Sequence, residues 1–195
     1  MKPIVLSEIN NLVEYEKVRK RVREHVIATK KLRRISVGPN MTFAFENRET
    51  VLFQIQEMVR TERIVEDERI QHEIDVYNQL IPGDHELSAT LLIEITDKDQ
   101  IKPILDSLIG LGYNSVFFNI GDNEITTQFD EGQAAEDRIS AVQYVKWKLG
   151  EEDVQALRSP HTPVAIVVRH RNYNYTSPLT EDQREALLED LAESI

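Results

Sequence analysis

Three side chains near the middle of the sequence have types and a spacing that could hold a metal ion. Glu68 and His72 are four residues apart, and Asp75 follows His72 by three. On a helix all three would lie on one face, and two carboxylates with an imidazole suit a divalent transition metal. We favour the alternative, a solvated helix face, because arginines alternate with these acids. The Glu-x-x-His motif that di-iron bundles use does not occur in the sequence.

A second group of polar side chains lies just before this one. Two glutamines stand among apolar residues, and an amide that is buried without partners costs roughly 1–3 kcal/mol. These amides should therefore reach solvent, or else bind a ligand or a partner chain. We favour the structural explanation over the ligand. The residues that could form such a surface are Gln54, Gln56, Glu57 and Arg60.

A third group follows the most β-branched run of the chain, in the segment RHRNYNYTSP. It places cations beside aromatic rings, which can bind an anionic or planar ligand through charge and stacking. The alternative, which we favour, is that the tyrosines pack over a sheet edge and the arginines pair with nearby acids. The residues concerned are Arg169, His170, Tyr173 and Tyr175.

Several common chemistries find no support in the sequence. There is no cysteine, which excludes disulfides, thiolate nucleophiles and iron-sulfur ligation by this chain. No G-x-S-x-G, G-x-G-x-x-G or P-loop motif is present. A metal- or ligand-binding enzyme that uses the groups above stays open as the second hypothesis.

The charge is divided unevenly along the chain. Residues 1–40 carry ten Lys/Arg against four Asp/Glu, a balance of +6, whereas residues 41–195 carry thirteen against thirty, a balance of −17. The body should repel a polyanion, so nucleic-acid binding is not expected. We favour an N-terminal basic arm that docks on the acidic body of its own chain or of a second copy.

The elements that position these residues can be read from the hydrophobic pattern. A basic amphipathic helix is expected from Ser7 to about Lys30, and a β-hairpin around Gly38-Pro39-Asn40. Residues 48–80 form either one long helix capped by Asn47 or two helices that break near Thr61. We favour the break, because the apolar stripe changes phase there.

The second half of the chain is richer in strands. Strands are expected at 87–95, 115–120, 124–129, 140–149 and 164–170, helices at 97–111, 151–158 and 180–191, and a loop at 130–137. This order predicts an α+β fold with a mixed or antiparallel sheet that carries helices on one face. We expect a helical region at residues 1–83 and a sheet region at 84–195, joined in one unit.

The runs FENRETVLFQIQEMVRTERI, RRISVGPNMTFAFE and YNQLIPGDHELSATLLIEI resemble an uncharacterised bacterial family of unknown function, over nearly the whole chain. The genes of that family lie beside genes for rubrerythrin-like di-iron proteins and iron-sulfur oxidoreductases. The resemblance implies an accessory role in an oxidative-stress or electron-transfer system, with the redox centre held by another protein.

These observations together predict a cytoplasmic, non-enzymatic accessory or scaffold protein. The basic arm and the central helix should contact a partner, and the protein should be a homodimer with a possible redox-system partner. No cofactor and no membrane contact are expected, since no apolar run is long enough to span a bilayer.

Overall fold

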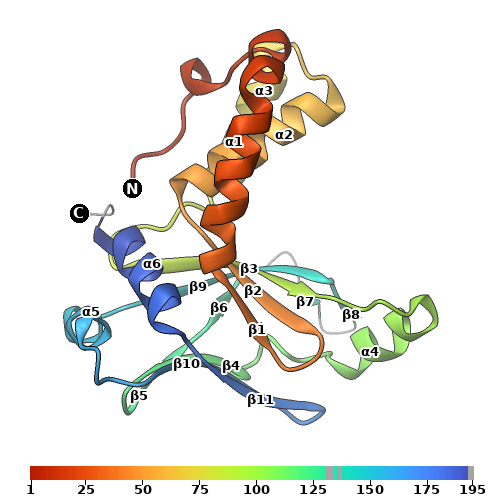
Figure 1. Cartoon of the computed structure of the whole chain (residues 1–195). Coiled ribbons are helices and arrows are strands. Elements are labelled where there is room, and N and C mark those ends of the chain that lie inside the picture. Colours follow the sequence, from red (N-terminus) through yellow and green to blue (C-terminus); the bar gives the residue numbers. More distant parts are fainter. Residues whose placement is uncertain (131–133, 136–137, 193–195) are drawn as a thin grey trace.

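Two antiparallel sheets packed face to face form the body of the protein (Figure 1). The structure is a computed structural model that describes residues 1–130, 134–135 and 138–192. In spatial order, the five-stranded sheet contains β1 (Arg34–Val37), β2 (Met41–Glu46), β3 (Glu86–Ile93), β9 (Val142–Lys148) and β6 (Gln128–Phe129). The four-stranded sheet contains β11 (Tyr173–Pro178), β10 (Val164–His170), β4 (Val116–Ile120) and β5 (Asn123–Thr126).

Helices occupy the rest of the described chain, together with a small two-stranded sheet. The strands of that sheet are β7 (Ala134–Ala135) and β8 (Arg138–Ile139). The α-helices are α1 (Leu12–Leu32), α2 (Arg48–Glu62), α3 (Asp67–Asn78), α4 (Ile101–Ser107), α5 (Glu151–Arg158) and α6 (Glu181–Ala192). Two short 3-10 helices are η1 (Leu6–Glu8) and η2 (Lys98–Gln100). The predicted α+β class is confirmed.

The core between the sheets is dominated by aromatic rings. Trp147 is fully buried, and its ring stacks on Phe45 with 5.4 Å between centroids. Phe43 and Phe118 pack against the same indole. The Trp147 Nε1–H donates a hydrogen bond to Thr127 Oγ1 at 2.7 Å, which satisfies the one polar atom of the side chain.

The strands form two sheets rather than the single sheet that the element order suggested. The run predicted as one strand at 124–129 is interrupted at Thr127, so that β5 joins one sheet and β6 the other. Thr127 is buried and accepts the hydrogen bond of Trp147. The chain therefore crosses from one sheet to the other at Thr127, the residue that is held by the hydrogen bond from Trp147. The predicted loop at 130–137 lies largely outside the described residues.

A second core lies among the N-terminal helices, which extend away from the sheets in Figure 1. The helical break is confirmed: α2 and α3 are separate, and Arg63 takes a left-handed conformation with φ of 55° between them. Asn47 caps α2 by accepting a hydrogen bond from the Thr50 N–H at 2.9 Å. The N-terminal helix begins after Asn11 and not at Ser7, because the Asn11 side chain caps it through the Glu14 N–H.

The outer face of the five-stranded sheet is covered by helices but carries polar residues. Strand β2 is buried on both faces. The Glu46 carboxylate accepts hydrogen bonds from Thr50 on α2 at 2.6 Å and from Thr90 on β3 at 2.9 Å. These bonds tie the sheet to the helices through a buried carboxyl group. Within the described residues, no helix is long and apolar enough to cross a membrane.

Candidate functional site

Glu57 joins α2 to the basic arm. Its carboxylate accepts two hydrogen bonds from Arg19, both at 2.8 Å, and one from the Tyr15 hydroxyl at 2.8 Å. The hydrogen bond from Arg19 lowers the pKa of Glu57, and burial raises the pKa of Tyr15. Arg60 completes the network through Glu16 at 3.3 Å. This network can hold α1 on α2 through specific polar contacts.

The two glutamines of α2 have different surroundings. Gln56 is buried, and its amide bonds both main-chain groups of Asn10, accepting from the N–H and donating to the carbonyl, each at 2.9 Å. Such pairing satisfies the amide and anchors the N-terminal segment on α2. Gln54 is half-buried and interacts with the Tyr77 hydroxyl. In both cases the amide has a partner within the chain.

The basic arm is only partly neutralised by its own chain. Ion pairs connect Arg19 to Glu57, Lys30 to Glu46, Arg33 to Asp190 and Arg34 to Glu94. By contrast, no ion pair with any residue in the described ranges is formed by Lys20, Arg21, Arg23 or Lys31. These four side chains point their charge at solvent from the surface of α1.

Glu68, His72 and Asp75 lie on the exposed surface of α3. Asp75 accepts a hydrogen bond from Gln71 at 2.8 Å. Over residues 1–130, 134–135 and 138–192, no three His, Cys, Asp or Glu side chains are arranged to hold a metal ion. The geometry therefore adds no support to a metal site, which stays a prediction. Elemental analysis of protein purified without added chelator would test it.

The residues after β10 mostly secure neighbouring strands. The Tyr173 hydroxyl donates to the Val37 carbonyl at 2.6 Å and accepts from two N–H groups of the β1–β2 turn. A Cβ at Gly38 would lie 2.6 Å from this hydroxyl, so the turn needs glycine both for space and for its φ of +66°. Tyr175 is 43% exposed and packs on Tyr173.

The other two members of that group are also engaged. Arg169 pairs with Glu124 at 2.6 Å and lies over the Phe117 ring. His170 is buried, with its Nε2 3.2 Å from the Ile109 carbonyl. The four residues of the third predicted group are neighbours on one hairpin, and Tyr173 and Tyr175 both lie against the turn that contains Gly38. Their arrangement can stabilise the sheet edge.

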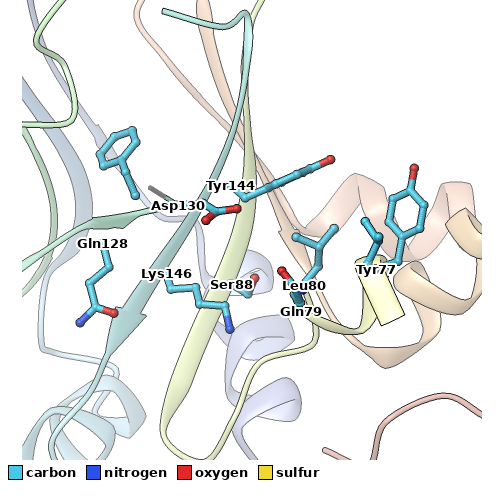
Figure 2. Close-up of a pocket in the computed structure, with 10 residues that line it drawn as sticks. Tyr77, Gln79, Leu80, Ser88, Gln128, Asp130, Tyr144 and Lys146 are labelled. Atoms are coloured by element: carbon cyan, nitrogen blue, oxygen red, sulfur yellow. The ribbon is translucent and has the colours of Figure 1, made fainter. Parts of the chain in front are cut away.

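A pocket that none of these groups predicted lies between the C-terminal end of α3 and the outer face of the five-stranded sheet (Figure 2). Its volume is about 430 Å³. Helix α3 and the turn after it supply one wall, and strands β3, β6 and β9 supply the other. The lining residues are Val76, Tyr77, Gln79, Leu80, Ser88, Gln128, Phe129, Asp130, Tyr144 and Lys146.

The charged groups of the pocket differ in whether an opposite charge pairs with them. Lys146 pairs with Glu86 at 2.8 Å, and this hydrogen bond opposes the effect of burial and leaves the pKa of Glu86 lowered. The Asp130 carboxylate has no ion-pair partner in the part of the chain that the structure describes. Burial, followed by the charges of Tyr77, Glu46 and Asp130, raises the pKa of Tyr144.

Sequence reasoning missed this pocket because its residues come from four separate elements. Tyr144 and Lys146 alternate with core residues on β9, so the sequence could place them only on the outer face. Asp130 stands where a loop was expected. A local motif would need neighbouring residues, whereas here the strand order β3-β9-β6 brings the side chains together.

A comparison with known proteins places this chain in a family. No curated protein matches it. A solved structure, described as a novel protein of unknown function from Burkholderia pseudomallei K96243, is 31% identical and matches with a TM-score of 0.90. That match covers 97% of this chain and 100% of the other chain. Residues 3–191 match the family described as "Protein of unknown function (DUF3501)", and the chain therefore belongs to the DUF3501 family.

Proposed function

We propose that this protein is a cytoplasmic, non-enzymatic accessory or scaffold protein that acts as a homodimer. The observation that carries the proposal is the opposite charge on two exposed helix surfaces, α1 and α3, of the helical projection. In the dimer, the basic surface of α1 contacts the acidic surface of α3 from a second copy. The projection stands clear of the sheets in Figure 1, which leaves both helices accessible.

The α1 surface offers cations and apolar side chains together. Four of its cations form no ion pair with any described residue: Lys20, Arg21, Arg23 and Lys31. Val13, seven residues before Lys20, is 68% exposed, and Ile27, between Arg23 and Lys31, is 51% exposed. Exposed apolar residues are ordinary when they stand singly, but here they share a helix with cations that form no ion pair within the described part of the chain. This combination favours contact with a partner protein over exposure to solvent.

The α3 surface offers the complement. Asp67, Glu68 and Asp75 are exposed and form no ion pair with the residues that the structure describes. Val65, just before α3, is 66% exposed. In a two-fold dimer each such contact occurs twice, since residue i of one copy meets residue j of the other and the reverse. One α1–α3 contact and its symmetry-related copy would therefore use both basic surfaces and both acidic surfaces of the dimer.

The first test is the mass of the protein in solution, measured by light scattering after size exclusion at micromolar concentrations. We expect a dimer that weakens as salt is added, because exposed charges are screened. Reversing the α1 charges with Arg21→Glu and Arg23→Glu should weaken the dimer by roughly 10- to 100-fold, since like charges would then face each other. A wild-type monomer would overturn the proposal.

A charge-swap variant supplies the matched control. Reversing α3 alone with Glu68→Lys and Asp75→Lys should also weaken the dimer. Combining both pairs of reversals in one chain should restore it, because the two surfaces are complementary again. Dissociation that persists in the combined variant, with helical content unchanged by circular dichroism, would show that α1 and α3 do not meet. Arg19 is left unchanged because it already binds Glu57.

The family resemblance supports a further partner outside the dimer, a protein of an oxidative-stress or electron-transfer system. A rubrerythrin-like di-iron protein, purified and loaded with iron, is the probe. We expect the two proteins to co-elute in size exclusion at low salt. Separate elution at every ratio would remove this partner from the proposal and leave the homodimer untouched.

A further inference from the structure

The pocket between α3 and the outer face of the five-stranded sheet has the chemistry of a small-molecule site. We propose that it binds a small organic cation, an ammonium group carried on a short apolar body. The proposal is independent of the homodimer. It depends on three features of the pocket: an uncompensated carboxylate, aromatic walls and a buried hydroxyl that faces the cavity.

The carboxylate sets the charge of the ligand. Asp130 and Lys146 are the charged lining residues, and the ammonium of Lys146 is already neutralised by Glu86 at 2.8 Å. Asp130 is exposed and has no ion pair with any described residue. The pocket with its neighbour Glu86 thus carries a net charge of −1, from one cation and two carboxylates. A cation gains from this field and an anion does not.

The walls add a contact that a cation can use. The rings of Tyr77 and Tyr144 line the cavity beside Leu80, and Figure 2 shows Tyr144 extending from the Asp130 side toward Leu80. Aromatic faces attract ammonium groups, most strongly where water is partly excluded. Leu80 and Val76 offer surface for an apolar body. Carboxylate and rings together favour an organic ammonium over a hydrated metal ion.

Ser88 supplies the polar group at the floor. Its side chain is 2% exposed and has no hydrogen-bond partner among the described residues, although its hydroxyl faces the pocket in Figure 2. A ligand that carries a hydroxyl or an amine beside its charge can hydrogen-bond with it.

Choline and 3,3-dimethyl-1-butanol are matched probes for this site. The two molecules have nearly the same shape and the same hydroxyl, but only choline is charged. Each is titrated at millimolar concentrations into the full ¹⁵N-labelled chain and followed by NMR. We expect saturable shifts centred on Tyr77, Ser88 and Tyr144 with choline, and at least about tenfold weaker binding of the neutral alcohol, which corresponds to roughly 1.4 kcal/mol.

Variants then separate the site from the general acidity of the protein. Asp130→Asn should weaken choline binding by about tenfold. Asp122→Asn removes the same charge in the turn between β4 and β5, away from the pocket lining, and should leave binding unchanged. Ser88→Ala should weaken choline by a smaller factor and have no effect on tetramethylammonium, which has no hydroxyl.

Three results would overturn the proposal. One is the absence of saturable shifts with choline and with tetramethylammonium. Another is equal binding of choline and its neutral analogue, which would show that charge is not recognised. The third is an equal loss of affinity in Asp130→Asn and Asp122→Asn, which would reduce the effect to attraction by the net charge of −11.

Discussion

The two faces of the five-stranded sheet are both covered, yet they differ in chemistry. The inner face meets the second sheet through Phe43, Phe45 and Trp147, all buried and apolar. The outer face meets the helices through Glu46 and Thr90, which are also buried but hydrogen-bonded. One face is held by area removed from water, which has no direction, and the other by bonds that require particular partners.

The difference indicates where binding can develop. An apolar interface packs closely and leaves no polar group waiting for a ligand. On the outer face Glu46 accepts hydrogen bonds from Thr50 on α2 and Thr90 on β3, whereas Ser88, its register partner on β3, lines the pocket. The inner face therefore supplies stability, and the outer face supplies the positions at which a ligand could replace a missing partner.

The largest effect should come from the inner face. Trp147→Ala removes the ring that three phenylalanines contact, and such truncations cost about 3–5 kcal/mol. It also leaves the buried Thr127 hydroxyl without its donor. Urea unfolding would measure the loss. Trp147→Phe should lose less stability, because phenylalanine keeps much of the side-chain volume. Equal losses from the two substitutions would show that ring packing does not account for the stability lost in Trp147→Ala.

An intermediate effect should come from the outer face. Glu46→Ala leaves the hydroxyls of Thr50 and Thr90 without their shared acceptor, at roughly 1–3 kcal/mol. Glu46→Gln keeps one oxygen and should lose less. The same unfolding experiment ranks both variants against Trp147→Ala. The contrast between the faces breaks down if Glu46→Ala is as harmful as Trp147→Ala, or if Glu46→Gln is as harmful as Glu46→Ala.

The smallest effect should depend on pH and concerns the contact of α1 with α2. The hydrogen bond from Arg19 lowers the folded-state pKa of Glu57 below its ordinary value of 4.5. A carboxyl with a lowered pKa stabilises the fold above the unfolded value, and this contribution is lost as pH falls through the folded pKa. Glu57→Gln should therefore be less stable at pH 7 by about 1 kcal/mol.

The pH series itself supplies the control for this variant. Below about pH 4.5 the difference between wild type and Glu57→Gln should shrink, because protonation removes the same charge from the wild-type side chain. Thermal melting across this pH range measures it. A difference that stays constant with pH would mean that the amide disturbs packing and that the Arg19 bond adds nothing.

Local features of the fold followed from the sequence where the physics is local. The cap at Asn47, the break between α2 and α3 and the capping box of α6, where Thr180 bonds Gln183, all depend on residues within one turn. The pattern of α3 also placed Glu68, His72 and Asp75 on one exposed surface. Side chains three and four apart on a helix must share a face, so no tertiary information was needed.

Partners distant in sequence were decided only by the tertiary structure. Gln56 was predicted as a candidate contact residue, and the structure shows that its amide hydrogen-bonds the main chain of Asn10, forty-six residues away. Nor could alternation along 124–129 show that the strand divides at Thr127 between two sheets. The pocket joins Tyr77, Ser88, Asp130 and Tyr144 from separate elements. Periodicity determines which face a residue occupies, but only the packing of strands and helices determines what that face meets.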